Sequence, residues 1–130
     1  MFEIVHTKLG KLIYEDEGWW KGRTEIDGLK VEFFVDGSAK EINETLAEDC
    51  AEVLADFHKL KEKALVFLEK HRKDQQIHQE LEFMPTEIWN FFRKGTDKYF
   101  TMGFIEKTKP GYLWRVEFEN SEPKEAGFDS

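Results

Sequence analysis

The chain has 130 residues, of which 40% are hydrophobic, 35% charged and 15% aromatic, and this composition suits one globular domain over residues 1–130. Nineteen Lys and Arg against 27 Asp and Glu give a net charge of −8, which argues against nucleic acid as a partner, because binding to a phosphate backbone needs a basic surface. No apolar run approaches the roughly 20 residues that a membrane-spanning helix needs, so membrane insertion is excluded too.

Two short edge strands, Phe2–His6 and Lys11–Tyr14, are predicted ahead of a β-hairpin over Trp19–Val35. The centre of the hairpin, Asp27-Gly28, has the residues that a two-residue type I′ turn prefers. A two-residue turn fixes the register, which places apolar residues on one face and opposite charges on the other. The predicted pairs are Trp20 with Val35, Gly22 with Phe33, Thr24 with Val31 and Ile26 with Leu29, and then Arg23 with Glu32 and Glu25 with Lys30.

After the hairpin the hydrophobic period changes from two to about 3.6 residues, which predicts one long amphipathic helix. Its apolar stripe comprises Leu46, Cys50, Val53, Leu54, Phe57, Leu60, Ala64, Leu65, Phe67 and Leu68. Thr45 and Glu48 have the spacing of a capping box, so Thr45 is predicted to cap the helix. Cys50 is interpreted as a buried structural thiol, because it lies on the stripe and no neighbouring cation activates it.

The segment that follows the long helix is ambiguous. Lys73–Gln79 is polar and has no Gly or Pro, and the sequence does not decide between helix and loop there. Pro85-Thr86-Glu87, followed by an aromatic-rich run, predicts a second, short helix that stops at Gly95. A strand is the alternative, since Ile, Trp and Phe also favour sheets.

A second hairpin is predicted near the end of the chain. Lys107–Gly111 contains a Pro-Gly turn signal and separates two strand-like runs, Tyr99–Glu106 and Tyr112–Glu119. The register that satisfies both faces pairs Phe100 with Phe118, Met102 with Val116 and Phe104 with Trp114, and on the other face Thr101 with Glu117 and Gly103 with Arg115. A last short edge strand, Glu125–Phe128, is predicted after it.

These elements predict a single α+β domain. Its antiparallel sheet, built from the two main hairpins plus the short edge strands, packs on one long amphipathic helix, and a second short helix accompanies them. The predicted core consists of Trp20, Ile26, Val31, Phe33, Val35, Val53, Phe57, Phe67, Met102, Phe104, Trp114, Val116 and Phe118.

Charge is uneven along the chain. Residues 1–58 contain 14 acidic and 6 basic side chains, whereas residues 59–130 contain 13 of each. We therefore expect the N-terminal half to attract a basic protein partner. The single cysteine cannot form an internal disulfide, and Met1–His6 lacks the basic start and apolar run of a secretory signal, so we expect a cytoplasmic protein.

The best candidates for a partner contact are Trp19 and Phe34. Adjacent residues of a strand point to opposite faces, so Trp20 enters the core and Trp19 lies with Phe34 on the outer face. Exposed aromatic residues are enriched at binding hot spots, although another strand or the N-terminal segment is an alternative cover for both. The predicted polar rim consists of Arg23, Glu25, Lys30 and Glu32, and the acidic run Glu15, Asp16 and Glu17 is a predicted electrostatic docking patch.

No motif predicts catalysis, a metal or a cofactor. The glycine-rich, metal-binding and nucleophile motifs GxGxxG, GxxxxGK, HExxH, GxSxG and CxxC do not occur. His71 and His78, with Asp74 between them, are about 10 Å apart along a helix axis, too far to share one zinc ion. We therefore expect no metal and no cofactor.

The opening segment His6–Tyr14 with Trp19-Trp20 resembles the start of small bacterial families of unknown function, and Leu113–Phe118 is similar to the closing hairpin of some of them. Several of these families are found beside polymorphic toxin genes, which implies an immunity role. Together with the charge and the aromatic surplus, the resemblance predicts a non-catalytic, protein-binding domain of the immunity or inhibitor kind. The alternative is a small-ligand-binding protein or an enzyme with a pocket between sheet and helix.

Overall fold

The computed structural model describes residues 2–15, 17–74, 82–107 and 109–129, and within them the chain forms eight strands and two helices. All eight strands lie in one sheet, in which each strand neighbours the strands next to it in the chain. In sheet order they are β1 (Glu3–His6), β2 (Gly10–Glu15), β3 (Trp19–Ile26), β4 (Leu29–Asp36), β5 (Phe83–Lys94), β6 (Asp97–Glu106), β7 (Lys109–Glu119) and β8 (Glu122–Asp129). All neighbours are antiparallel except β4 and β5, which are parallel.

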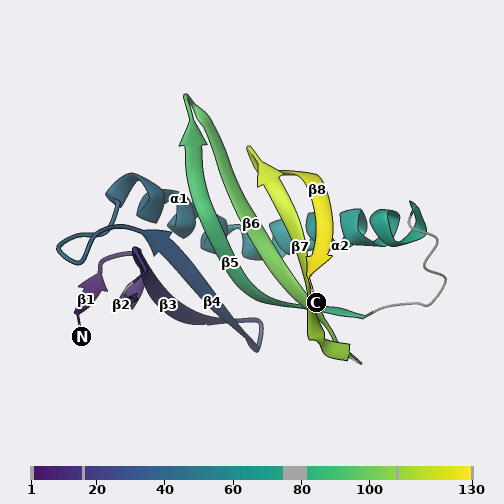
Figure 1. Cartoon of the computed structure of the whole chain (residues 1–130), viewed down its shortest axis with the longest axis horizontal. Coiled ribbons are helices and arrows are strands. Elements are labelled where there is room, and N and C mark those ends of the chain that lie inside the picture. The colour runs from purple at the N-terminus through teal and green to yellow at the C-terminus, as the bar shows by residue number, and fades with distance from the viewer. Residues whose placement is uncertain (1, 16, 75–81, 108, 130) are drawn as a thin grey trace.

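The two helices connect the parallel strands. Antiparallel neighbours are joined by short turns, but parallel neighbours need a crossover connection. The crossover here is α1 (Glu44–Ala55) followed by α2 (Phe57–Asp74), and both helices lie across one face of the sheet (Figure 1). Neither of these helices is long and apolar enough to cross a membrane, within the residues that the structure describes.

The predicted architecture is wrong in its sheet and in its helices. The sheet is one mixed sheet of eight strands, not an antiparallel sheet of two hairpins with short edges. The predicted short helix from Pro85 to Gly95 is the 12-residue strand β5, which was the alternative assignment. Its helix-start residues are overridden because β5 pairs on both sides, with β4 and with β6, and pairing in a sheet outweighs a weak local propensity.

The predicted long helix is divided in two at Asp56. The backbone of Asp56 departs from helical geometry, at φ −100° and ψ 16°, yet its amide and carbonyl still bond Glu52 and Leu60. The apolar stripe is buried on both sides of this break, at Cys50 in α1 and Leu68 in α2 among others. The periodicity therefore predicted the buried face correctly but not the break, for which the sequence has no Pro or Gly signal.

Both predicted hairpin registers are confirmed. In the β3–β4 hairpin, Trp20 is opposite Val35 and Arg23 is opposite Glu32. Asp27 and Gly28 have positive φ values of 52° and 77°, as a type I′ turn requires. In the β6–β7 hairpin all five predicted pairs occur, including Gly103 with Arg115.

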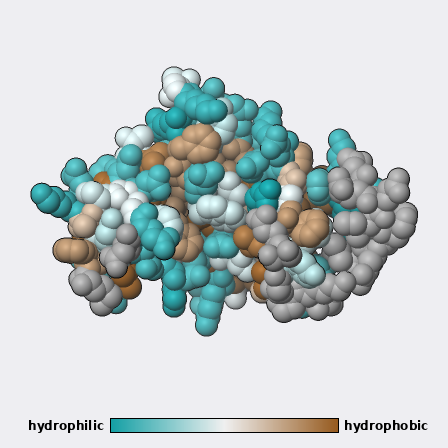
Figure 2. All heavy atoms as spheres, viewed as in Figure 1, coloured by the Kyte–Doolittle hydropathy of each residue, from teal (hydrophilic) through white to brown (hydrophobic). Residues whose placement is uncertain are grey.

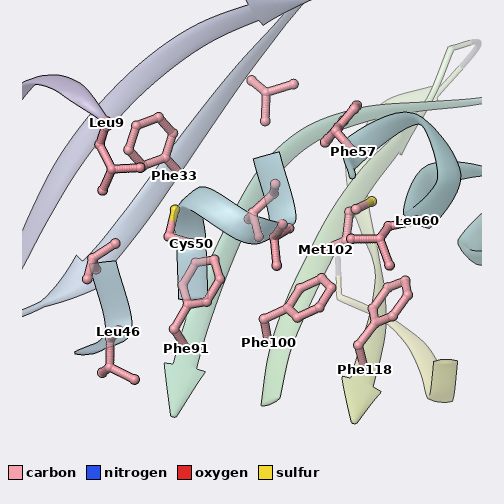
Figure 3. Close-up of a cluster of buried hydrophobic side chains, with 14 of the residues drawn as sticks. Leu9, Phe33, Leu46, Cys50, Phe57, Leu60, Phe91, Phe100, Met102 and Phe118 are labelled. Carbon is pink, nitrogen blue, oxygen red and sulfur yellow. The ribbon is translucent and has the colours of Figure 1, made fainter. Parts of the chain in front are cut away.

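The core lies between the sheet and the helices. Figure 3 shows Phe91, Phe100 and Phe118 side by side, beneath α1 and α2, from three neighbouring strands. The ring centroids of Phe100 and Phe118 are 4.5 Å apart in a stacked arrangement. The predicted core residues are buried, except that Ile26 and Phe67 are only partly buried.

A β-bulge in β5 controls which aromatic residues face the core. The pairing of β5 with β6 shifts between Trp89 and Phe92, and Asn90 has a positive φ of 60°. Asparagine tolerates this left-handed conformation better than most residues. Because the bulge adds one residue, Phe91 is buried while Trp89 and Phe92 on either side are only half-buried.

The predicted cap at Thr45 is wrong. The N-cap of α1 is Asn43, whose side-chain oxygen accepts a hydrogen bond from the Leu46 amide at 3.1 Å. Thr45 lies inside the first turn of α1 and is exposed. The helix begins two residues earlier than a Thr45 cap allows, because Asn43 is already bonded to β4 from its amide to the Asp36 carbonyl.

Asn43→Ala is expected to lower the free energy of unfolding by about 1 kcal/mol, because it removes the acceptor for an otherwise unpaired helix amide. Thr45→Ala, two residues away, is the matched control and is expected to change it by less than about 0.5 kcal/mol. Urea denaturation of both variants measures this difference. Equal losses would contradict the assignment of Asn43 as the cap.

Phe33→Ala is expected to cost about 3–5 kcal/mol, because the side chain is fully buried at the centre of the sheet. Val66→Ala, on the exposed side of α2, provides the surface control. Chemical denaturation measures the free energy of unfolding of both variants, with one denaturant m-value used for the two fits. A loss below about 1 kcal/mol for Phe33→Ala would show that this face of β4 is not the core face.

Candidate functional site

The face of the sheet opposite the helices, here called the open face, is the candidate functional surface. No helix of the described chain covers it, because both helices of the crossover lie on the other side (Figure 1). Figure 2 views the molecule from the open face and shows apolar side chains gathered near its middle, with hydrophilic side chains around them. Apolar side chains that no other element covers often mark a binding surface.

A hollow of about 510 Å³, here called the open-face hollow, lies on this surface. Its lining comes from four strands and consists of Trp19, Phe34, Asp36, Glu87, Trp89, Asn90 and Leu113. Binding sites for small groups usually measure roughly 300–1,000 Å³, so the hollow is large enough to receive a side chain or a small ligand. Of these described lining residues two are acidic and none is basic.

The floor of the hollow depends on Gly103. A carbon placed as a side chain on Gly103 would lie 2.7 Å from the Trp89 ring and 3.1 Å from both the Glu87 and Leu113 side chains. These three side chains therefore converge over one glycine. Gly103 has an ordinary backbone conformation, so the need for glycine here is one of space.

Trp19 and Phe34 form an aromatic wall. Their ring centroids are 6.3 Å apart and their planes meet at 89°, an edge-to-face contact. Both side chains are half-buried, so neither a strand nor the N-terminal segment covers them fully. The ammonium group of Lys21 lies 5.8 Å from the centre of the Phe34 ring, which is a cation–π distance.

Two glutamates are neighbours where the parallel strands meet. Glu32 of β4 is opposite Glu87 of β5. Burial acts to raise the pKa of Glu32, but the hydrogen bonds and charges of Lys21, at 3.0 Å, and Arg23, at 3.1 Å, outweigh burial and hold that pKa below its usual value. Glu32 is therefore ionised, and its negative charge is balanced by two basic side chains.

Glu87 differs from Glu32. Within the described residues its carboxyl forms no hydrogen bond or ion pair, and only the more distant charge of Lys21 favours its ionised form. Burial, followed by the negative charge of Glu32, raises the pKa of Glu87. The open-face hollow thus holds a half-buried carboxyl whose negative charge is incompletely compensated.

The other predicted contact residues lie beside the open-face hollow or away from it. Arg23, Glu25, Lys30 and Glu32 line a second hollow of about 530 Å³ with Thr86. It forms where β4 and β5 diverge, since these strands pair at only two positions. Glu15 is opposite Trp19 in the β2–β3 pair, Glu17 is exposed in the turn, and Asp16 lies outside the described residues.

Glu87, Trp89 and Leu113 line the hollow, although the sequence pattern did not indicate them as candidates. The segment of Glu87 and Trp89 was interpreted as a helix, which hid the fact that alternate residues of a strand share one face. In the strand alternative, residues 87 and 89 lie on one face, which can be the outward face that carries Phe34. Leu113 of β7 reaches the hollow across β6 because Gly103 has no side chain to block it.

On the helix side, the hollow between sheet and helices is small and the Cys50 thiol is not activated. A hollow between sheet and helices measures about 60 Å³, well below the roughly 300 Å³ of a small-molecule site. Burial, followed by the charge of Asp49, raises the pKa of the Cys50 thiol well above its usual range, so it is not an activated nucleophile. Asp49 itself is held by Arg93 through two hydrogen bonds of 2.8 and 2.6 Å.

In the part of the chain that the structure describes, no three His, Cys, Asp or Glu side chains are grouped to hold a metal ion. His71 is half-buried near the end of α2, while His78 and the side chain of Asp74 lie outside what is described.

Comparison with protein-family models, with curated proteins and with solved structures found no match to this chain.

Glu87→Gln tests the electrostatics of the hollow. A raised pKa in the folded state means that the protonated carboxyl contributes stability below its usual pKa of 4.5, and that this contribution is lost as pH rises through the folded-state pKa. Glutamine suffers no such loss. We therefore expect equal free energies of unfolding below about pH 4 and a more stable variant at neutral pH, as measured by urea denaturation.

Glu25→Gln, an exposed carboxyl on the same face, is the matched control for the charge change. The free energy of unfolding of Glu25→Gln is expected to stay close to that of the wild type across the same pH range. A Glu87→Gln variant that is less stable than the wild type at neutral pH would mean that the carboxylate has a stabilising partner.

Proposed function

We propose that this chain is a non-catalytic binding domain that takes a basic segment of a partner protein on the open face of its sheet. The observation that carries the proposal is the open-face hollow, in which Trp19, Phe34 and Trp89 are grouped with two carboxylates and no basic side chain among the described lining residues. Aromatic anchors at the centre of a contact, with charges around them, are the usual composition of a protein-binding hot spot.

The charge of the chain supports a basic partner. A net charge of −8 raises the rate at which a positively charged protein encounters the surface, and the excess of acids falls in residues 1–58, which supply β3 and β4. An acidic domain that covers a basic working surface acts as an inhibitor. Inhibition is also the role that the resemblance of the opening and closing segments to toxin-associated families implies.

A matched pair of short labelled peptides tests the proposal. The two share their apolar residues, and one carries Lys and Arg where the other carries Glu. We expect fluorescence anisotropy to show binding of the basic peptide alone, and binding to weaken as salt screens the charges. Trp19→Ala and Trp89→Ala are each expected to weaken it about tenfold or more.

Val66→Ala on α2 is the control variant, since Val66 is an exposed apolar residue far from the open face. It is expected to bind the basic peptide as the wild type does. Equal binding of the acidic peptide, or equal loss in Val66→Ala and Trp89→Ala, would contradict docking on the open face. Thermal denaturation of each variant confirms that it is folded.

A further inference from the structure

We propose that the open-face hollow is a subsite for the guanidinium group of an arginine side chain, with the Glu87 carboxylate as its counter-ion and the rings of Trp19, Phe34 and Trp89 as its walls. This inference rests on the proposed function, because the arginine belongs to the basic segment of the partner protein. It names the side chain of that segment, arginine, that the hollow prefers.

The charge of the hollow favours a cation. The hollow contains Glu87 and Asp36, and the described residues that line it include no cation to neutralise them. Lys21, the basic side chain whose charge acts on Glu87, is already bonded to Glu32 at 3.0 Å. An incompletely compensated carboxyl beside a second carboxylate favours any cation that reaches it, and the cation gains most where water is partly excluded.

The aromatic lining of the hollow also favours a cation. The faces of Trp, Tyr and Phe rings attract cations through their quadrupoles. Phe34 already has one such contact, with the ammonium group of Lys21 at 5.8 Å, but that ammonium is held by Glu32. The two tryptophan rings of the hollow have no cation–π partner among the described residues, so they are available to an incoming cation.

The shape and hydration of the cation favour arginine over lysine. A guanidinium is flat, weakly hydrated and able to stack on a ring while it donates two parallel hydrogen bonds to one carboxylate. An ammonium is compact and strongly hydrated, and loses more on entering an apolar-walled hollow. The chain uses the same two-bond geometry elsewhere, where Arg93 holds Asp49 at 2.8 and 2.6 Å.

Gly103 is the positioning residue of the subsite. Since the side chains of Trp89, Glu87 and Leu113 converge over it, a methyl group at this position must displace at least the Trp89 ring, at 2.7 Å. Gly103→Ala therefore changes the position of the ring without removing any group that contacts the cation. We expect it to weaken the preference for arginine while the salt-dependent attraction of basic peptides stays.

The test uses three small probes, the blocked amides of arginine, of lysine and of citrulline, which is the neutral isostere of arginine. Titrations are followed by the tryptophan indole signals in proton–nitrogen spectra. We expect the arginine amide to shift the signals of Trp19 and Trp89, lysine to shift them less and citrulline not at all. Trp20 and Trp114, which are buried on the other face, serve as internal references.

The matched peptide experiment uses two basic peptides that differ only in carrying Arg or Lys at every basic position. We expect the arginine peptide to bind about fivefold or more tightly. Glu87→Gln is expected to abolish this preference, and Glu62→Gln, which removes the same charge from the exposed side of α2, is expected to keep it.

The outcomes separate the two proposals. Basic peptides that bind with no preference for arginine, or a preference that survives Glu87→Gln, would overturn the subsite and leave the binding function. An arginine amide that shifts Trp19 and Trp89 while no basic peptide binds would support the subsite and overturn the proposed partner. Failure of every probe to shift either signal would overturn the subsite.

Discussion

The parallel pairing of β4 with β5 is the contact on which the rest of the structure depends. It joins two antiparallel halves, β1–β4 and β5–β8, into one sheet through only two residue pairs, Glu32 with Glu87 and Phe33 with Ile88. Because parallel strands need a crossover, the same pairing forces both helices into one connection on one face. The other face is consequently left without a helix, and the candidate site lies there.

The same pairing also creates the chemistry of the site. It brings the outward residues of β3 and β4, Trp19 and Phe34, beside Glu87 and Trp89 of β5. It also sets two carboxylates side by side, of which only Glu32 has basic partners. The site is thus assembled from segments that are about 50 residues apart in the chain and meet at a single strand pair.

This explains what the sequence predicts and what it does not. Both hairpin registers follow from local information, since a turn such as Asp27-Gly28 fixes every later pair and alternation decides the faces. The β4–β5 pairing has no local signal, because the segments are joined by 46 intervening residues, from Gly37 to Glu82. Local alternation therefore predicts that Trp19 and Phe34 share the outer face, but not that Glu87 and Trp89 lie beside them.

The position of Glu87 costs the folded state stability, and that cost is an argument for its role. Burial and the neighbouring carboxylate raise the pKa of Glu87, so that its ionisation lowers the stability of the fold. A neutral residue of similar shape would avoid this loss of stability. The fold does not require the carboxylate, because Glu87 forms no hydrogen bond or ion pair among the described residues. A bound cation reverses the sign of the effect, since the attraction that is missing in the free protein is then supplied by the ligand. Residues that destabilise the free state and gain from a ligand are concentrated at binding sites, and this is the pattern that the proposed subsite assigns to Glu87.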